Sequence, residues 1–544
     1  MPTLAKLMKE GVSATLESVL PPITPPAWTT FITGKNQGKH GIFNFVQSED
    51  TSAYSMNYVN GGHRRAATVF QLLNGAGFTA GTMNIPFTYP PEPLHGFQIS
   101  GLDTPTDNSP FVHPPDLHDE LRNHLGAFQH DIRFLGYMST SERRARVLAE
   151  LEKLDTQWTK AALYLLENHP QDLMMFVFMS IDTVQHYFWQ YMDPKHFLYD
   201  ENAEPRFRSA VRDVYERLDA AAGRIIQRLP AETTIFVVSD HGGGPVADRV
   251  IYLNRYLAQL GLLKYLPQSR SAIYQATTKA IRLAFSILRN SLTSRQKTLL
   301  AKLLPKLRKK AELSYTSFNT IDWARTKAYC SEVLAAPPSI RINLKGVKRY
   351  GVVEPSEYEA LCEFIVDKLR ELKDPRTGKP VIARVYRRDE IFHGPFATEG
   401  ADLTLDWWSE DSLFSSEPSF PEESHKPPLV IRQRSASAGK KPEWGGTHRR
   451  GGILIARGPS FKSGTEMNRA QLADMAPTLL HLFGVPIPED MDGKVLVDLF
   501  RPEFLSKQPV QRSGISAISS RDSGYTDEER SQVEERLQAL GYLE

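Results

Sequence analysis

Cysteine is almost missing from this chain. Only Cys330 and Cys362 occur among its 544 residues, which excludes a disulfide framework and a zinc site made of several cysteines. Long apolar runs are missing as well, since no stretch approaches the roughly 18 consecutive apolar residues of a membrane-spanning helix. The first residues also lack the basic start and apolar segment of a secretory signal. We therefore expect a protein located in the cytoplasm.

An excess of charge of one sign is absent too. The chain carries 65 Lys and Arg against 63 Asp and Glu, a net charge of +2, so we expect no nucleic acid partner. The hydrophobic share of 41% excludes a disordered or collagen-like chain. The length suffices for roughly two to four domains of ordinary size.

What is present is a series of apolar runs that end in polar residues. Two of them end in aspartate, and a helical pattern precedes each, which is typical of buried parallel strands with helices on both sheet faces. The sequence predicts an α/β fold of three layers, α/β/α, around a central and mostly parallel sheet. Because ligands bind at the carboxyl ends of such strands, Asp182 and Asp240 are expected at one rim. The runs lie at Gly77–Asn84, Leu173–Asp182 and Thr233–Gly244, and the helical patterns at Arg143–Glu167 and Ala210–Arg228.

One segment departs from the even charge balance. Residues 249–311 contain 14 Lys and Arg and no Asp or Glu, and residues 280–310 are amphipathic with a helical pattern. Such a pattern indicates either a helix packed on protein with a solvated basic face, or peripheral contact with an anionic membrane surface or anionic substrate. We interpret the segment as a cap inserted into the fold.

The pattern divides the chain into five parts. A first part of a catalytic core is predicted at 1–248, and the second part of that core at 447–500. The basic helical cap is predicted at 249–325, and a mixed α/β subdomain on the substrate side, ending in a loop rich in Ser and Pro, at 326–446. A tail with a terminal helix is predicted at 501–544. The oligomeric state is left open.

Paired Asp and His side chains follow the predicted strands. Asp182 and His186 are four residues apart, so on a helix they share one face, and Asp240 and His241 are adjacent. His448 precedes a predicted strand within a glycine-rich stretch. Carboxylate oxygen and imidazole nitrogen suit Zn²⁺, with Mn²⁺ as an alternative. Taken singly, each pair is more often structural and His448 more often a surface residue, but two pairs at one rim favour metal binding.

Thr24 lies in a proline-rich turn before a helical segment. A hydroxyl at a helix start can simply cap the helix. A threonine beside a metal ion is instead a candidate nucleophile, since the ion lowers the hydroxyl pKa and the helix N-terminus favours phosphate charge. Both interpretations remain open from these residues alone.

Together these motifs resemble the alkaline phosphatase superfamily, and within it the type I phosphodiesterase and nucleotide pyrophosphatase family. The resemblance implies that Thr24 is the nucleophile, that Asp182, His186 and His448 hold one divalent metal, and that Asp240 and His241 share a second one with Thr24. The motifs are Thr33-Gly34, His40-Gly41-Ile42, Asp182-x-x-x-His186, Ser239-Asp240-His241-Gly242, Gly446-Thr447-His448 and the closing segment Asp474–Leu496.

The sequence departs from that family in three places. The family has a first strand that ends in a further metal-binding aspartate, and no such strand precedes Thr24, so we expect that the chain starts one strand late. Nucleotide pyrophosphatases place asparagine three residues after the nucleophile, where this chain has Ala27. Sulfatases need Cys or Ser at the nucleophile position, so Thr24 disfavours that activity.

The resemblance therefore implies a two-metal hydrolase of small phosphate esters, of phosphodiester or nucleotide pyrophosphate type, that acts through a covalent phosphothreonine on Thr24. One alternative is a weakly active or inactive metal-binding relative that lacks a ligand. Another is a phosphoryl-group transferase at a membrane surface.

Overall fold

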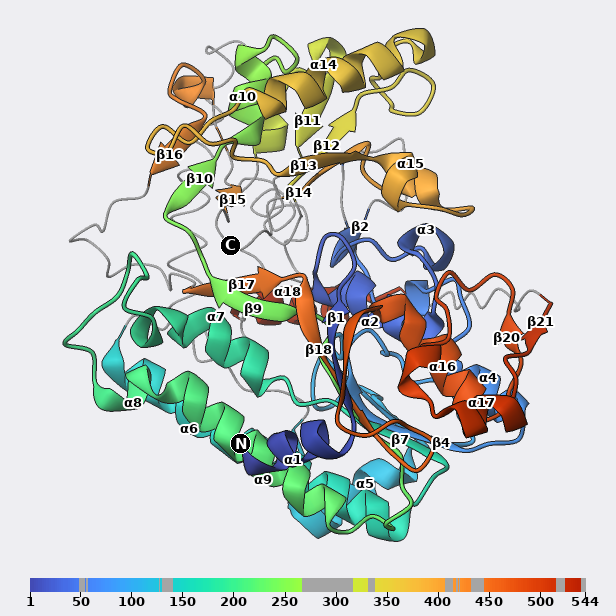
Figure 1. Ribbon diagram of the computed structural model, residues 1–544. Coiled ribbons are helices and arrows are strands. Elements are labelled where there is room, and N and C mark those ends of the chain that lie inside the picture. The colour runs from blue at the N-terminus through green and yellow to red at the C-terminus, as the bar shows by residue number, and fades with distance from the viewer. Residues whose placement is uncertain are drawn as a thin grey trace.

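The computed structural model in Figure 1 shows a lower α/β body and a smaller upper one. The structure describes residues 1–47, 54, 57–126, 128–129, 140–266, 317–330, 338–406, 414–416, 419, 421–431, 445–514 and 524–539. The lower body, which we call the core, holds the segments predicted as core at 1–248 and 447–500. The upper body, which we call the cap from here on, holds the described residues of 249–431, that is, residues of both the predicted cap and the predicted substrate-side subdomain.

One four-stranded sheet of the core joins residues from both ends of the chain. Its order is β19-β1-β18-β8, where β18 is antiparallel to both of its neighbours and β19 is parallel to β1. Helix α1 (Pro2–Glu10) leads into it, and the Asp219 carboxylate of another helix accepts the Thr3 and Leu4 amides at the start of α1. The strands are β1 (Val12–Glu17), β8 (Ile235–Val238), β18 (Gly451–Arg457) and β19 (Thr465–Gln471).

A second four-stranded sheet has the order β6-β5-β4-β7. Its β5, β4 and β7 strands are parallel, and β6 is an antiparallel edge. The strands are β4 (Ala80–Ile85), β5 (Gly96–Ser100), β6 (Val112–His113) and β7 (Leu173–Phe176). The apolar runs predicted as strands therefore all contain strands, although each strand is shorter than its run.

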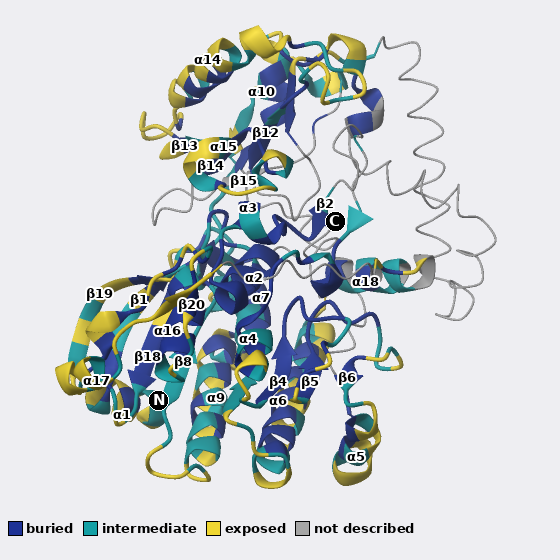
Figure 2. Ribbon diagram, turned by 90° about the vertical axis from the view of Figure 1, so that its right-hand side faces the viewer, coloured by how far each residue is buried: buried dark blue, intermediate teal, exposed yellow. Residues whose placement is uncertain are grey.

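Helices cover both faces of these sheets (Figure 2). In β7, Met174 and Phe176 pack into one apolar cluster and Leu173 and Met175 into another, as the alternation of side chains along a strand requires. The predicted α/β fold is thereby confirmed. The first cluster includes residues of helices α5 (Asp116–Leu125), α6 (Ser141–Asn168), α7 (Ser180–Met192) and α9 (Ala210–Ile226), and the second includes residues of α2 (Thr24–Thr33), α4 (Val69–Gly75) and α16 (Met475–Leu482).

The two sheets meet at β7 and β8. Phe236 and Val238 of β8 pack against the same cluster as Leu173 and Met175 of β7, but in the described part of the chain no ladder hydrogen bonds join the two strands. Every residue of both strands is half-buried, whereas strands covered by helices on both faces are ordinarily buried. The family's first strand, which is expected before Thr24 and is missing from the sequence, is not tested by these contacts and stays a prediction.

The cap is built on its own sheet and its own apolar cluster. Its four-stranded sheet has the order β11-β12-β14-β13, and a three-stranded sheet with the order β15-β10-β16 lies beside it. Two strands fall where the sequence predicts a long loop, β15 (Phe414–Ser416) and β16 (Leu429–Ile431). The other elements are β10 (Arg249–Ile251), α10 (Leu253–Gln259), β11 (Ala328–Cys330), β12 (Ser339–Ile342), α14 (Tyr358–Arg370), β13 (Arg384–Arg387), α15 (Arg388–Ile391) and β14 (Leu403–Asp406).

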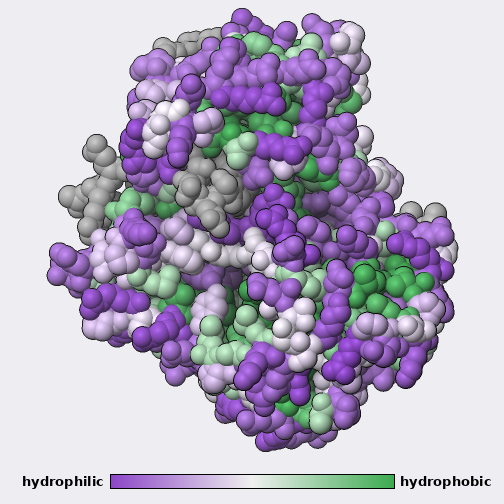
Figure 3. Space-filling model, viewed as in Figure 1, coloured by the Kyte–Doolittle hydropathy of each residue, from purple (hydrophilic) through white to green (hydrophobic). Residues whose placement is uncertain are grey.

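The basic helical pattern predicted at 280–310 lies outside the described residues, and so does the membrane contact proposed for it. Among the helices that the structure does describe, none combines the length and the apolar character needed to cross a membrane. The face of the molecule seen in Figure 3 is mainly hydrophilic over core and cap alike.

Short elements complete the core. They are α3 (Gln37–His40), β2 (Val46–Gln47), β3 (Asn57–Tyr58), α8 (Pro205–Arg208), β9 (Gly242–Pro245), β17 (Gly446–Arg449), β20 (Ile487–Pro488), α17 (Pro502–Lys507), β21 (Arg512–Ser513) and α18 (Asp527–Ala539).

Candidate metal centre

The first pair of candidate ligands lies on helix α7. Asp182 is predicted at a strand end, but β7 ends at Phe176 and Asp182 lies in the first turn of α7. The chain leaves the sheet ladder before it turns into the helix, so the aspartate moves from strand to helix without leaving the rim. His186 follows one turn later, with Nε2 at 3.3 Å from Asp182 Oδ1.

The third candidate ligand comes from a two-stranded ribbon. His448 lies in β17, opposite Gly243 of β9. Its Nε2 is 3.5 Å from Asp182 Oδ1 and 3.0 Å from His186 Nε2. One ligand atom from each of these three residues lies within 4.8 Å of the other two. The structure thus brings together the three residues that the resemblance assigns to one metal.

Backbone carbonyl groups fix how both imidazoles face the cluster. His186 Nδ1 lies 2.9 Å from Gly446 O, and His448 Nδ1 lies 2.7 Å from Pro22 O. A carbonyl only accepts, so each Nδ1 donates its proton, and in the neutral ring Nε2 keeps its lone pair. Two imidazole lone pairs and the Asp182 carboxylate then converge, which is a donor set that fits Zn²⁺ or Mn²⁺.

Glycine permits the ribbon to approach α7 this closely. A Cβ on Gly446 would lie 2.3 Å from Gln185 O, and a Cβ on Gly445 would lie 2.7 Å from Gln190 N. The Gly445 amide donates to the carbonyl of the ligand residue on α7 at 2.8 Å. Any larger residue at these positions would push the ribbon, and His448 with it, away from the helix.

Asp240 and His241 lie against this cluster. They follow β8 directly, as predicted. The His241 ring stacks on the His448 ring with 3.7 Å between centroids, and its Nε2 is 3.9 Å from Asp182 Oδ1. Among the described residues Asp240 Oδ2 has no hydrogen bond, and it lies 3.5 Å from His241 Nε2. A buried carboxylate oxygen of this kind is a typical site for a cation.

Thr24 is the first residue of α2, and the residue before it occupies the N-cap position. The Thr24 hydroxyl therefore does not cap α2, the role that one of the two interpretations of its place in the sequence gives it. Thr24 is 1% exposed, and its Oγ1 has no hydrogen-bond partner in the described part of the chain. The carbonyl of Pro22, two residues earlier, is the one that binds His448. This bond ties the turn before Thr24 to the metal ligands.

The N-terminus of α2 offers few amide donors. Pro25 and Pro26 have no N–H group, and the Ala27 amide donates to Ile23 O at 3.1 Å. The expected contribution of the helix start to binding a phosphate is thus limited to the helix dipole and the Thr24 amide. Most of the positive charge at this site has to come from cations.

A buried histidine, His40, is hydrogen-bonded to Thr30 in α2. His40 Nδ1 accepts the Ile42 amide at 3.1 Å, so its Nε2 carries the proton and donates it to Thr30 Oγ1 at 3.0 Å. Burial holds the pKa of His40 well below 6.5, and three nearby cations lower it further. These cations are Arg64, Arg65 and Lys35.

The ionisable ligands influence one another strongly. Burial by itself would raise the pKa of Asp182, but the facing His186 and His448 outweigh it and hold that pKa well below its usual range. Burial opposes protonation of His186, yet Asp182 raises its pKa above 6.5. Burial and the charge of His241 lower the pKa of His448 to about 3. Burial raises the pKa of Asp240 to about 6.

Sequence reasoning missed the carbonyl groups of Pro22 and Gly446, because a backbone carbonyl leaves no mark on residue type. It also missed Asn84, which lies near the carboxyl end of β4 with φ of 63° and donates to Val177 O at 3.5 Å. A non-glycine residue with positive φ cannot be foreseen from the sequence.

Comparisons with known proteins give a family and several distant structures. The profile described as "Type I phosphodiesterase / nucleotide pyrophosphatase" matches residues 1–431. Murine ectonucleotide pyrophosphatase / phosphodiesterase 5 is similar at 14% identity and a TM-score of 0.43, over 92% of this chain and 94% of that one. Phosphonoacetate hydrolase from Sinorhizobium meliloti 1021, in complex with phosphonoacetate, is similar at 15% identity and a TM-score of 0.48, over 88% of both chains.

Comparison with curated protein sequences finds no match. The family profile nevertheless covers well over half of the chain, including Thr24, Asp182, His186, Asp240 and His241. It ends before His448, so the third ligand rests on geometry. On this match the chain belongs to the type I phosphodiesterase / nucleotide pyrophosphatase family, a family of phosphoester hydrolases.

Proposed function

We propose that this protein hydrolyses small phosphate esters with Thr24 as its nucleophile and with divalent metal ions as cofactors, Zn²⁺ or Mn²⁺. The observation that carries the proposal is the convergence of the Asp182 carboxylate with the Nε2 atoms of His186 and His448. The buried Thr24 hydroxyl lies two residues after Pro22, whose carbonyl binds His448. Asp182, His186 and His448 would hold one ion, and Asp240, His241 and Thr24 would hold a second.

Bound dications would supply positive charge to the phosphoryl oxygens and lower the pKa of a coordinated hydroxyl. The nucleophilic role falls to a residue of the chain. Thr24 Oγ1 attacks phosphorus, a new oxygen–phosphorus bond forms, and the alcohol or phosphate leaving group departs with its bonding electron pair. Water then hydrolyses the phosphothreonine, which restores the Thr24 hydroxyl and releases the phosphate product.

The positions of the side chains support this division of roles. The Pro22 carbonyl binds His448 and holds the turn before Thr24 at the cluster. The α2 helix cannot supply amide donors from Pro25 and Pro26, so neutralisation of the phosphoryl charge falls to the ions that Asp and His hold.

The test measures hydrolysis of bis-p-nitrophenyl phosphate and p-nitrophenyl phosphate with Zn²⁺ and with Mn²⁺. Thr24→Ala should lose at least about a thousandfold in kcat, and His448→Ala should lose metal-dependent activity. Thr15→Ala, which truncates an exposed threonine of β1, is the matched control and should behave as wild type.

The outcomes separate the alternatives. Equal activity in Thr24→Ala and wild type refutes the nucleophile. Tight metal binding by an inactive wild-type protein favours a silent binding protein, and turnover only with an added alcohol acceptor favours a transferase.

A further inference from the structure

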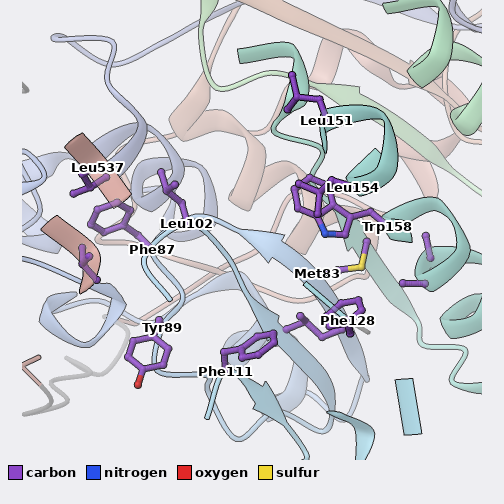
Figure 4. Close-up of a cluster of buried hydrophobic side chains, with 14 of the residues drawn as sticks. Met83, Phe87, Tyr89, Leu102, Phe111, Phe128, Leu151, Leu154, Trp158 and Leu537 are labelled. Carbon is purple, nitrogen blue, oxygen red and sulfur yellow. The ribbon is translucent and has the colours of Figure 1, made fainter. Parts of the chain in front are cut away.

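The C-terminal helix α18 packs into the apolar cluster of the core. Tyr525, Val533 and Leu537 are 6%, 2% and 3% exposed and belong to the same cluster as residues of β4 and β5. In Figure 4 the Leu537 side chain lies beside Phe87, close to Leu102. The helix lies beyond residue 431, where the match to the family ends.

Several polar contacts of this segment reach one stretch of the core. Tyr525 Oη donates to the Asp103 carbonyl at 2.7 Å. Tyr89 Oη donates to the Glu529 carboxylate at 2.6 Å, and the rings of Tyr89 and Tyr525 are stacked with 6.2 Å between centroids. Arg536 also donates to the Pro105 carbonyl at 3.2 Å. The segment 524–537 therefore packs on residues 89–105 and is hydrogen-bonded to them.

The residues just before Tyr89 contain an unfavourable backbone. Asn84 and Phe87 have φ of 63° and 62°, a left-handed conformation that non-glycine residues adopt only when their surroundings impose it. The Asp103 carboxylate accepts the Thr88 amide at 3.2 Å and the Tyr89 amide at 2.8 Å. The Asp103 residue thus links both sides, because its carboxylate holds residues 88–89 and its carbonyl holds Tyr525.

This stretch is hydrogen-bonded to the segment that leads into the helix of the candidate metal ligands. Strand β4 is parallel to β7 and hydrogen-bonded to it, and residues 84–89 leave its carboxyl end. The Val177 amide donates to Met83 O at 3.0 Å, and Asn84 donates to Val177 O. Helix α7, which carries Asp182 and His186, begins three residues later at Ser180. A movement of residues 84–89 would therefore be passed through Val177 to the start of α7.

We propose that Tyr525 and Leu537 are positioning residues, which hold residues 84–89 in a conformation with left-handed Asn84 and Phe87 and so shape the substrate-side wall of the active site. The proposal rests on the proposed function for its link to substrate. The C-terminal segment then governs how well substrate binds, while the metal ligands and Thr24 govern the chemical step.

The test combines amide exchange with steady-state kinetics on the full-length protein. In Tyr525→Ala the amides of Thr88 and Tyr89 should exchange roughly tenfold faster than in wild type. KM for bis-p-nitrophenyl phosphate should rise roughly threefold or more, while kcat changes less than about twofold. The milder Tyr525→Phe, which removes only the hydroxyl, should show smaller changes of the same sign. Val510→Ala, which truncates a 41% exposed residue, is the matched control and should change neither.

The amide exchange and the kinetics test the proposal separately. If the amides of α18 exchange faster but those of Thr88 and Tyr89 do not, the helix does not hold the loop and the proposal is refuted. A fall in kcat at unchanged KM also refutes it. Should the wild-type protein be inactive towards the ester, the proposed function fails, and exchange at Thr88 and Tyr89 still decides whether Tyr525 positions this wall.

Discussion

His40 should make the stability of the core depend on pH in a way that can be calculated. In the folded protein His40 is fully buried, and its pKa lies well below 6.5. In the unfolded chain a histidine has a pKa of about 6.5. As the pH falls below that value, the unfolded state binds a proton that the folded state does not, so the free energy of unfolding decreases.

The magnitude follows from the linkage relation. Each pH unit below the unfolded pKa removes about 1.4 kcal/mol per histidine. Going from about pH 7.5 to about pH 5.0 spans roughly 1.5 units below it, so His40 alone should lower the free energy of unfolding by about 2 kcal/mol. The contribution is fully present above pH 6.5 and continues to fall until the folded pKa is reached.

The assay is urea denaturation at the two pH values in wild type and in His40→Asn, whose Oδ1 can still accept the Ile42 amide. The variant should lose about 2 kcal/mol less than wild type over that range. Thr30→Val is the matched control. It removes the hydroxyl that receives the His40 proton, but it leaves burial and the three cations, which depress the pKa. Its pH dependence should match wild type.

If His40→Asn and wild type lose the same stability, the assignment of His40 as a buried neutral base is wrong. If Thr30→Val loses the pH dependence, the hydroxyl rather than burial sets the pKa. Either result would overturn the account of how α2 is held in place.

Three further predictions concern the site and α2. Gly446→Ala would place a Cβ 2.3 Å from Gln185 O, so affinity for Zn²⁺ measured by calorimetric titration should fall roughly 10- to 100-fold. Gly75→Ala, whose Cβ meets nothing within 4 Å, is the control and should match wild type. Equal Zn²⁺ affinities in the two variants and wild type would contradict the packing argument. Zn²⁺ at about 100 times its Kd should raise the free energy of unfolding by about 2.7 kcal/mol, and His448→Ala should abolish that gain; a gain that survives the substitution means that the ion binds elsewhere. Ala27→Asn places an amide at a fully buried position in an apolar cluster, which should destabilise the protein by roughly 1–3 kcal/mol in urea; unchanged stability would show that the cluster has a partner for the amide.

The sequence is most informative where spacing alone determines geometry. Asp182 and His186 are four residues apart, and one helical turn brings them together wherever the helix begins. The shift of Asp182 from a strand end into α7 therefore does not disturb the pair. Asp240 and His241 are found in the same way, since the apolar run before them ends directly at the rim.

His448 shows where this reasoning stops. Its place beside His186 depends on the ribbon of β9 and β17, on glycines that let the ribbon approach α7, and on the Pro22 carbonyl. None of these is visible as a periodic pattern. The prediction of one sheet likewise could not foresee the open edges of β7 and β8, because hydrogen bonding between strands far apart in sequence leaves no local signature.

The insertion of the cap between His186 and His448 also sets a time for assembly of the metal centre. The two histidines are 262 residues apart, and a ribosome adds about 5–20 residues per second. The nascent chain therefore carries Asp182 and His186 for roughly 13 to 52 seconds before His448 is synthesised. During that interval β1 also lacks its partners β18 and β19. Closure of the core sheet is thus a late event in biosynthesis, as loading of the proposed metal centre would be, and the cap has time to form its own apolar cluster first.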